Sequence, residues 1–138
     1  MVVAALVVSV LVVLYVQKRR ADNRAALQRQ AAYHAALRSF SETLKPGMSR
    51  KDVEDYLRAQ NRSFGQYLQK GYAYSDLVKV GEEPKPWFCS EWPVYVEFEF
   101  TADHQTQSLS GAVSGIPTPS KSDVLKEIHL TGHGEGCL

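Results

Sequence analysis

The chain has 138 residues and a formal net charge of +1, with 44% hydrophobic and 22% charged residues. Once a non-globular N-terminal segment is set aside, this length leaves room for one small domain with a hydrophobic core. The near-neutral charge gives no reason to expect nucleic acid or an acidic substrate as a partner. The early part of the chain is nevertheless basic, with Lys18, Arg19, Arg20, Arg24, Arg29 and Arg38.

The first predicted element is the apolar run VVAALVVSVLVVLYV, from Val2 to Val16. As a helix it would span roughly 22 Å, less than the hydrocarbon core of about 30 Å. It could be a signal-peptide region, a short uncleaved anchor, or an anchor whose start lies upstream of Met1. We expect an uncleaved transmembrane anchor over residues 1–17 that contacts membrane lipid, because bulky and charged residues follow the run where cleavage requires small ones.

Residues 18–39 are predicted to form a basic helical spacer, since they are rich in Ala, Leu, Arg and Gln and contain no Gly or Pro. This spacer is either solvated or lies on lipid head groups. The same helix is expected to continue beyond the spacer, and the larger apolar residues of its second half recur at helical spacing and are expected to pack on the domain. They are Tyr33, Leu37, Phe40 and Leu44.

The stretch LKPGMSRKDVEDYLRAQN predicts a second helix, because the PG pair breaks the first helix and Ser49 can cap the next one. Val53, Tyr56 and Leu57 form its apolar stripe. The charged residues alternate in sign and are expected on a solvated face, so we predict a structural helix rather than a catalytic one. They are Arg50, Lys51, Glu54, Asp55 and Arg58.

Beyond this helix the period changes to the alternation typical of strands. The clearest strand is WPVYVEFEFTAD, and residues 123–132 read as another, with Val124, Ile128 and Leu130 inward. Residues 71–81 are a third, and RSFGQYL begins that strand or pairs with it. The polar segment HQTQSLSGAVSGIPTPSKS predicts a long mobile loop. Residues 40–138 are therefore predicted as an α+β domain, with two helices packed on a three- to four-stranded antiparallel sheet.

Two cysteines lie far apart, Cys89 before the clearest strand and Cys137 in the glycine-rich tail GHGEGCL. We expect them to form a disulfide that fixes the tail to the domain. Two free thiols are one alternative. The other is a metal site in which His129 and His133 join both cysteines, since zinc sites mix Cys and His.

The segment EEPKPWFCSEWPVY gathers Trp87, Phe88, Trp92 and Tyr95, which could form a partner surface or cap the open end of a small core. The chain has no glycine-rich phosphate loop, no Gly-x-Ser-x-Gly elbow and no carboxylate pair in an apolar setting. We therefore expect a protein that is not an enzyme and has no cofactor.

The residues Gly47, Met48, Ser49, Asp52 and Val53 form a turn-and-helix pattern that resembles the SmpA/OmlA-type, or BamE-like, domains. The similarity covers this motif and the order of elements over residues 40–131, an architecture shared with β-lactamase-inhibitor-like domains. Members of the BamE-like group are typically lipid-anchored accessory components of outer-membrane protein assembly, whereas this chain has an apolar segment and no lipid-bearing cysteine. The resemblance implies a small α+β domain that faces the bacterial periplasm.

Together these patterns predict a non-catalytic, single-pass protein of the bacterial inner membrane with a periplasmic domain that binds a protein partner or supports envelope structure. A metal-binding or thiol-dependent protein that uses His129, His133, Cys137 and Cys89 is the alternative function. A cytoplasmic domain is the alternative location, because the basic cluster follows the anchor and positive residues favour the inner side.

Overall fold

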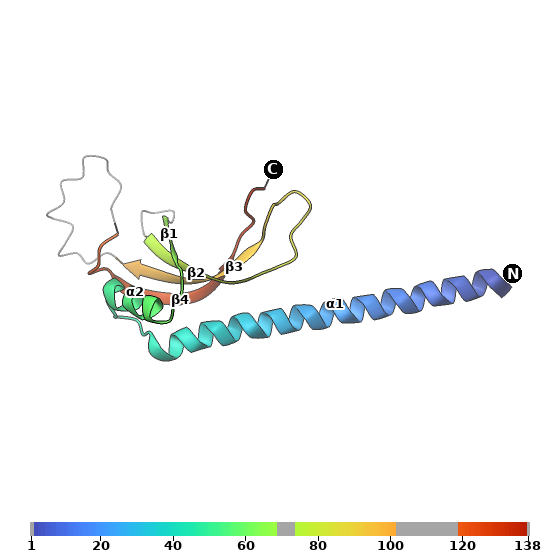
Figure 1. Ribbon diagram of the computed structural model, residues 1–138, viewed down its shortest axis with the longest axis horizontal. Coiled ribbons are helices and arrows are strands. Elements are labelled where there is room, and N and C mark those ends of the chain that lie inside the picture. The colour runs from blue at the N-terminus through green and yellow to red at the C-terminus, as the bar shows by residue number, and fades with distance from the viewer. Residues whose placement is uncertain (1, 69–73, 102–118, 138) are drawn as a thin grey trace. The chain divides into compact units, whose positions relative to one another are not determined.

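The computed structural model describes residues 2–68, 74–101 and 119–137, with side chains from Ser9 onward. The chain divides into two compact units, residues 1–32 and residues 33–138. The elements in chain order, labelled in Figure 1, are α1 (Val2–Thr43), α2 (Arg50–Ala59), β1 (Gly65–Leu68), β2 (Tyr74–Glu82), β3 (Pro93–Thr101) and β4 (Val124–Gly132).

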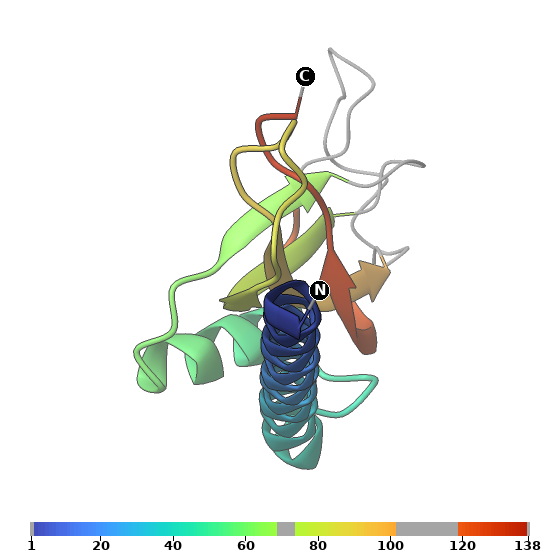
Figure 2. The same cartoon turned by 90° about the vertical axis from the view of Figure 1, so that its right-hand side faces the viewer.

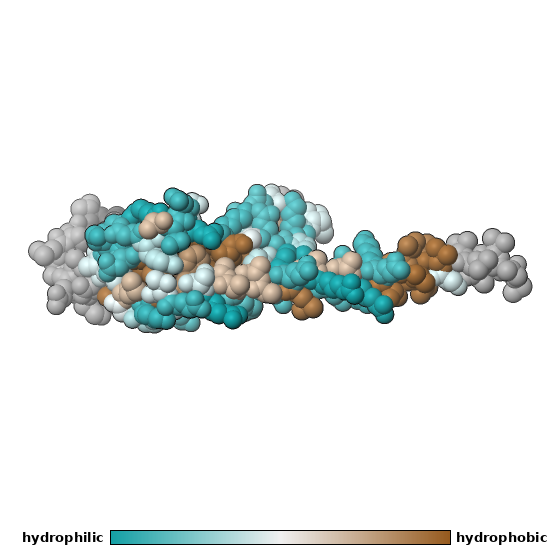
Figure 3. All heavy atoms as spheres, turned by 60° about the horizontal axis from the view of Figure 1, so that its bottom comes forward, coloured by the Kyte–Doolittle hydropathy of each residue, from teal (hydrophilic) through white to brown (hydrophobic). Residues whose placement is uncertain are grey.

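Helix α1 is continuous, although the sequence predicts an anchor, a spacer and a domain helix in succession. The run of good helix formers without Gly or Pro explains this continuity. From Val10 to Val16 the large hydrophobic side chains are 39% to 62% exposed, and Figure 3 shows apolar residues in brown on this helix. A helix long and apolar enough to cross a membrane is not found among the described residues.

Helix α2 begins and ends as its sequence predicts. The Ser49 side chain accepts a hydrogen bond from the Asp52 backbone N–H, which satisfies one of the free N–H groups at the helix start. After the helix, Asn61 adopts a left-handed conformation with φ of 53°, which Asn tolerates better than most residues. Val53 and Leu57 are fully buried, so the predicted apolar stripe faces the core.

The four strands form one antiparallel sheet in the order β1-β2-β3-β4, which confirms the predicted α+β class. Figure 2 shows α2 on one side of this sheet. The core forms between that face and the helices, where Phe40 and Leu44 of α1 meet Val96 and Phe98 of β3. The rings of Phe40 and Phe98 lie edge to face, with centroids 5.5 Å apart.

The inward residues of β4 differ from the prediction because the strand contains a β-bulge. Glu99 pairs with Glu127 but Phe100 pairs with Leu125, so Lys126 is an extra residue. The bulge reverses the alternation towards the start of β4. As a result Leu125, only 1% exposed, lies in the core cluster, and the prediction that Val124 does so is wrong.

Three predictions fall partly on residues outside the described ranges. These are residues 71–73 of the predicted third strand, residues 102–103 of the clearest predicted strand and residues 104–118 of the predicted loop. The rest of the third strand is β2, and the RSFGQYL segment contains β1, which pairs with it.

Candidate functional site

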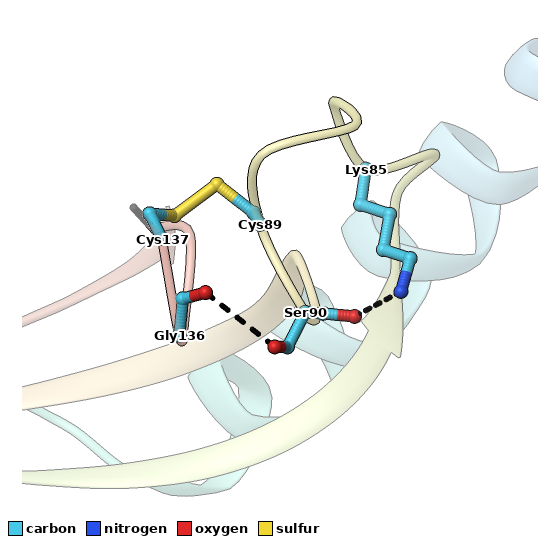
Figure 4. Close-up of a disulfide and its surroundings, with 5 residues drawn as sticks. All are labelled: Lys85, Cys89, Ser90, Gly136 and Cys137. Carbon is cyan, nitrogen blue, oxygen red and sulfur yellow. Dashed lines mark hydrogen bonds between the residues drawn. A yellow bond between two sulfur atoms is a disulfide. The ribbon is translucent and has the colours of Figure 1, made fainter.

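A disulfide joins the C-terminal tail to the loop between β2 and β3. Cys89 and Cys137 are bonded to each other, as the sequence predicts (Figure 4). The tail also pairs with the loop through its backbone: the Ser90 N–H donates to the Glu135 carbonyl at 3.0 Å, and the Glu135 N–H donates to the Glu91 carbonyl at 2.9 Å. Disulfide and ladder together hold the tail beside the loop.

Side chains strengthen this junction and explain the glycines of the tail. The Lys85 ammonium donates to the Ser90 carbonyl, and the Ser90 hydroxyl donates to the Gly136 carbonyl at 3.4 Å (Figure 4). A Cβ at Gly134 would lie 2.4 Å from the Cys137 sulfur and 2.8 Å from the Trp92 ring. Gly134 is therefore required for the tail to pass this close to the disulfide.

The metal site considered from the sequence is not assembled, because each cysteine sulfur is bonded to the other and neither is a thiolate ligand. His129 lies on β4 with Nε2 3.3 Å from a carboxylate oxygen of Glu97. His133 instead stacks on Tyr95, with ring centroids 5.6 Å apart, and its ring centroid lies 6.1 Å from that of Tyr67. The two histidines thus have different surroundings.

The four aromatic residues of the predicted partner surface fall into two groups. Trp87 is 91% exposed and forms an edge-to-face pair with the half-exposed Phe88. Trp92 packs over Gly134 near the disulfide, and Tyr95 lies on the sheet against His133. Of these four residues, only Trp87 and Phe88 therefore present a largely exposed aromatic ring.

Tyr95 also forms a hydrogen bond with the tail. Its hydroxyl donates to the Glu135 carboxylate at 2.7 Å. This hydrogen bond, with burial and the negative charge of Glu135, raises the pKa of Tyr95 to about 12. The phenol therefore stays protonated at neutral pH and acts as a structural donor.

The main feature that the sequence did not predict is a buried charge cluster at the start of α2. Arg50, expected on a solvated face, is 1% exposed. Its guanidinium donates to Asp123 at 3.0 Å, to Asp76 at 3.2 Å and to the Tyr74 carbonyl at 3.1 Å. It also lies over the Phe100 ring, 4.3 Å from the centroid.

Glu54, one turn further along α2, is likewise 1% exposed, so its predicted exposure is also wrong. Its carboxylate accepts hydrogen bonds from Arg58, at 2.7 Å, and from Lys121. Burial opposes ionisation, yet these two hydrogen bonds outweigh it and lower the pKa of Glu54 below its ordinary value. For Asp76 burial dominates over Arg50 and raises the pKa.

One sequence signal could have revealed this cluster. Arg50 is the first residue of α2, where the helix dipole is positive and a cation is disfavoured unless it has acidic partners. Asp76 occupies the same alternation as the buried Val78 on β2, which places its carboxylate on the core face. Because the cluster is buried and internally paired, its chemistry is that of a structural ion network.

Comparison of the chain with protein-family models, with curated proteins and with solved structures finds no match.

Proposed function

We propose that this chain is a non-catalytic envelope protein, held at a membrane by the apolar part of α1, whose disulfide-bonded domain binds a protein partner. The observation that carries the proposal is the unbroken run of exposed apolar and aromatic side chains from Val10 to Val16. Burying one large apolar side chain is worth roughly 1.5–3 kcal/mol. A run of them in water therefore favours transfer into lipid.

The basic residues that follow the apolar run support lipid contact. Their side chains are exposed on the same helix, and a cation near an anionic membrane surface is attracted by about 1 kcal/mol. They are Lys18, Arg19, Arg20 and Arg24.

An oxidising compartment is supported by the disulfide between Cys89 and Cys137, because such bonds persist mainly in exported proteins. The resemblance to SmpA/OmlA-type domains favours the same periplasmic location. The basic cluster after the apolar run favours the cytoplasmic alternative.

Trp87 and Phe88 are the proposed partner contact. They are exposed residues of the β2–β3 loop, which the disulfide at Cys89 fixes, so the aromatic pair is presented on an ordered support. Aromatic residues are enriched at the centres of protein interfaces.

Flotation of the full chain with anionic phospholipid vesicles tests the membrane part of the proposal. The wild type should float, and Val12→Glu/Leu14→Glu should remain with the soluble fraction. Leu27→Glu is the matched control, since Leu27 is a 67% exposed apolar residue of the same helix outside the apolar run, and it should float. Equal flotation of all three proteins would refute the membrane contact.

Labelling of the cysteines in cells tests the compartment. A membrane-impermeant maleimide should leave intact cells unlabelled until a reductant opens the disulfide. Labelling without reductant, and only after lysis, would place the domain in the cytoplasm and contradict the periplasmic location.

A further inference from the structure

The sheet face opposite the core carries a cluster of acidic and imidazole side chains from neighbouring strands. On β3 the core-facing residues Val96 and Phe98 alternate with Glu97 and Glu99, which therefore face away from the core. Glu99 pairs with Glu127, and Glu97 pairs with His129, so the β4 residues share this face.

Three of these side chains lie close enough to share one ion. One ligand atom from each of Glu99, Glu127 and His129 can be chosen so that all lie within 4.8 Å of one another. A set of imidazole nitrogen and carboxylate oxygen suits Zn²⁺ and related first-row ions. Ca²⁺ and Mg²⁺ prefer oxygen ligands alone.

A buried hydroxyl beside the cluster is a second, independent observation. Ser75 of β2 pairs directly with Glu99, so the two side chains are cross-strand neighbours on the same face of the sheet. Ser75 is fully buried, and within the described residues its Oγ has no hydrogen-bond partner. An unsatisfied buried hydroxyl costs free energy, which a metal ion or its bound water would recover.

The imidazole is also arranged for binding. Glu97, with its side chain 8% exposed, lies 3.3 Å from His129 Nε2 and favours a proton on that nitrogen. The other ring nitrogen, Nδ1, then carries the lone pair, and no hydrogen-bond partner for it lies among the described residues. A carboxylate against the second nitrogen is the usual support of a metal-binding histidine.

Lys126 competes with a bound cation. As the bulged residue of β4 it reaches Glu99, and its ammonium donates to Oε1 at 2.6 Å. The Lys126 side chain is about half exposed at 52%, so its ammonium can return to water if an ion displaces it. A divalent ion would have to displace the ammonium or use the other oxygen of Glu99.

We propose that Glu99, Glu127 and His129, with the Ser75 hydroxyl beside them, bind a divalent transition-metal ion, best represented by Zn²⁺. This site does not use the cysteines and is independent of the membrane contact proposed above. The cluster net charge, with Glu97 included, is negative, which a divalent cation offsets.

Titration calorimetry with Zn²⁺ on the full chain, with the disulfide intact, tests the site. Wild type should bind one ion, and both His129→Ala and Glu127→Gln should bind at least tenfold more weakly. His133→Ala is the matched control, because His133 stacks on Tyr95 outside the cluster, and it should retain the wild-type affinity. Glu127 is exposed, so Glu127→Gln remains informative if His129→Ala fails to fold.

Lys126→Met adds a test that a non-specific surface site would not pass. Removing the competing ammonium should tighten Zn²⁺ binding several-fold, whereas adventitious binding would be unchanged. No Zn²⁺ binding by wild type, equal binding by wild type and Glu127→Gln, or a loss in His133→Ala equal to that in His129→Ala would each refute the site. Tighter binding of Ca²⁺ than of Zn²⁺ would refute the assigned ion class.

Discussion

Arg50 shows how one side chain positions a helix. A cation at the first residue of α2 opposes the helix dipole, and its burial removes it from water. Both costs are offset by ion pairs with Asp76 and Asp123. Asp76 lies in β2, and Asp123 directly precedes β4. The start of α2 is thereby tied to two strands of the sheet.

Arg50→Met should therefore destabilise the domain by roughly 3–5 kcal/mol, because it leaves two carboxylates buried beside an apolar side chain. Urea unfolding followed by circular dichroism measures the change. Lys51→Met is the matched control, since Lys51 pairs with Asp55 on the surface, and it should change stability by less than about 1 kcal/mol. Equal stability of the two variants would contradict the role of Arg50.

Glu54 predicts a pH dependence of defined sign. Folding lowers its pKa from 4.5, although burial acts in the opposite direction, because Lys121 and Arg58 hydrogen-bond the carboxylate. Its contribution to stability is therefore present above the unfolded pKa and is lost as the pH falls through the folded pKa. The difference in unfolding free energy between wild type and Glu54→Gln should shrink as the pH falls below the ordinary value of 4.5.

Burial is the main cause of the raised pKa of Asp76, so this group contributes with the opposite sign. The negative charge of Glu54 adds to that shift, so only the part of the Asp76 contribution that does not depend on Glu54 cancels in this difference. Urea unfolding of the two proteins across this pH range gives the measurement. A difference that grows on acidification would contradict the assigned interaction.

At the scale of elements, the contact between α1 and β2 depends on a glycine, Gly81, which has no Cβ. Tyr33 lies over Gly81, where a Cβ would come within 2.4 Å of the ring, and its hydroxyl donates to the Glu82 carbonyl at 2.7 Å. Only glycine allows the ring to lie this close to the strand.

Gly81→Ala should cost roughly 1–3 kcal/mol, because the ring must move and its hydrogen bond is strained. Gly65→Ala in β1 is the matched control, since no atom lies within 4 Å of a Cβ there, and it should be neutral or slightly stabilising. Thermal unfolding distinguishes the two outcomes, and an equally small effect in both would disprove the close packing.

The sequence was sufficient to predict the order of the elements, because helical and alternating periods follow each other clearly and Ser49 caps α2. It was not sufficient to predict that Arg50 and Glu54 are buried. Charged residues that alternate in sign along a helix form the same pattern whether that face is exposed to solvent or packs against the ends of strands. The bulge at Lys126 was also missed, because it is defined by the pairing with β3 rather than by the strand itself.

The candidate sites likewise divide into features that a local sequence pattern predicts and features that depend on tertiary packing. The disulfide was predictable from two cysteines, one of them in a glycine-rich tail. The sequence did not predict that Trp92 and Tyr95 lie apart from Trp87. Their positions depend on the packing of the C-terminal tail, in which Gly134 contacts Trp92 and His133 stacks on Tyr95. The cluster of Glu99 and His129 requires the β3–β4 register, which no local pattern contains.

For the whole domain, the disulfide between Cys89 and Cys137 closes a loop with a sequence separation of 48. Chain entropy predicts a contribution of about 4 kcal/mol, less any native strain. Cys89→Ser/Cys137→Ser should therefore lower the unfolding free energy by roughly 2–4 kcal/mol in urea. Reductant should lower wild-type stability by a similar amount and leave the variant unchanged; a fully reduced wild type of unaltered stability would contradict this.

The partners of Arg50 also have a consequence for the folding route. Asp76 and Asp123 lie 26 and 73 positions away along the chain, so long segments must be closed before both carboxylates are in place. The guanidinium can therefore leave water only after β2 and β4 have been brought together. Docking of α2 is then a late event, and changes at Arg50 should speed unfolding more than they slow folding.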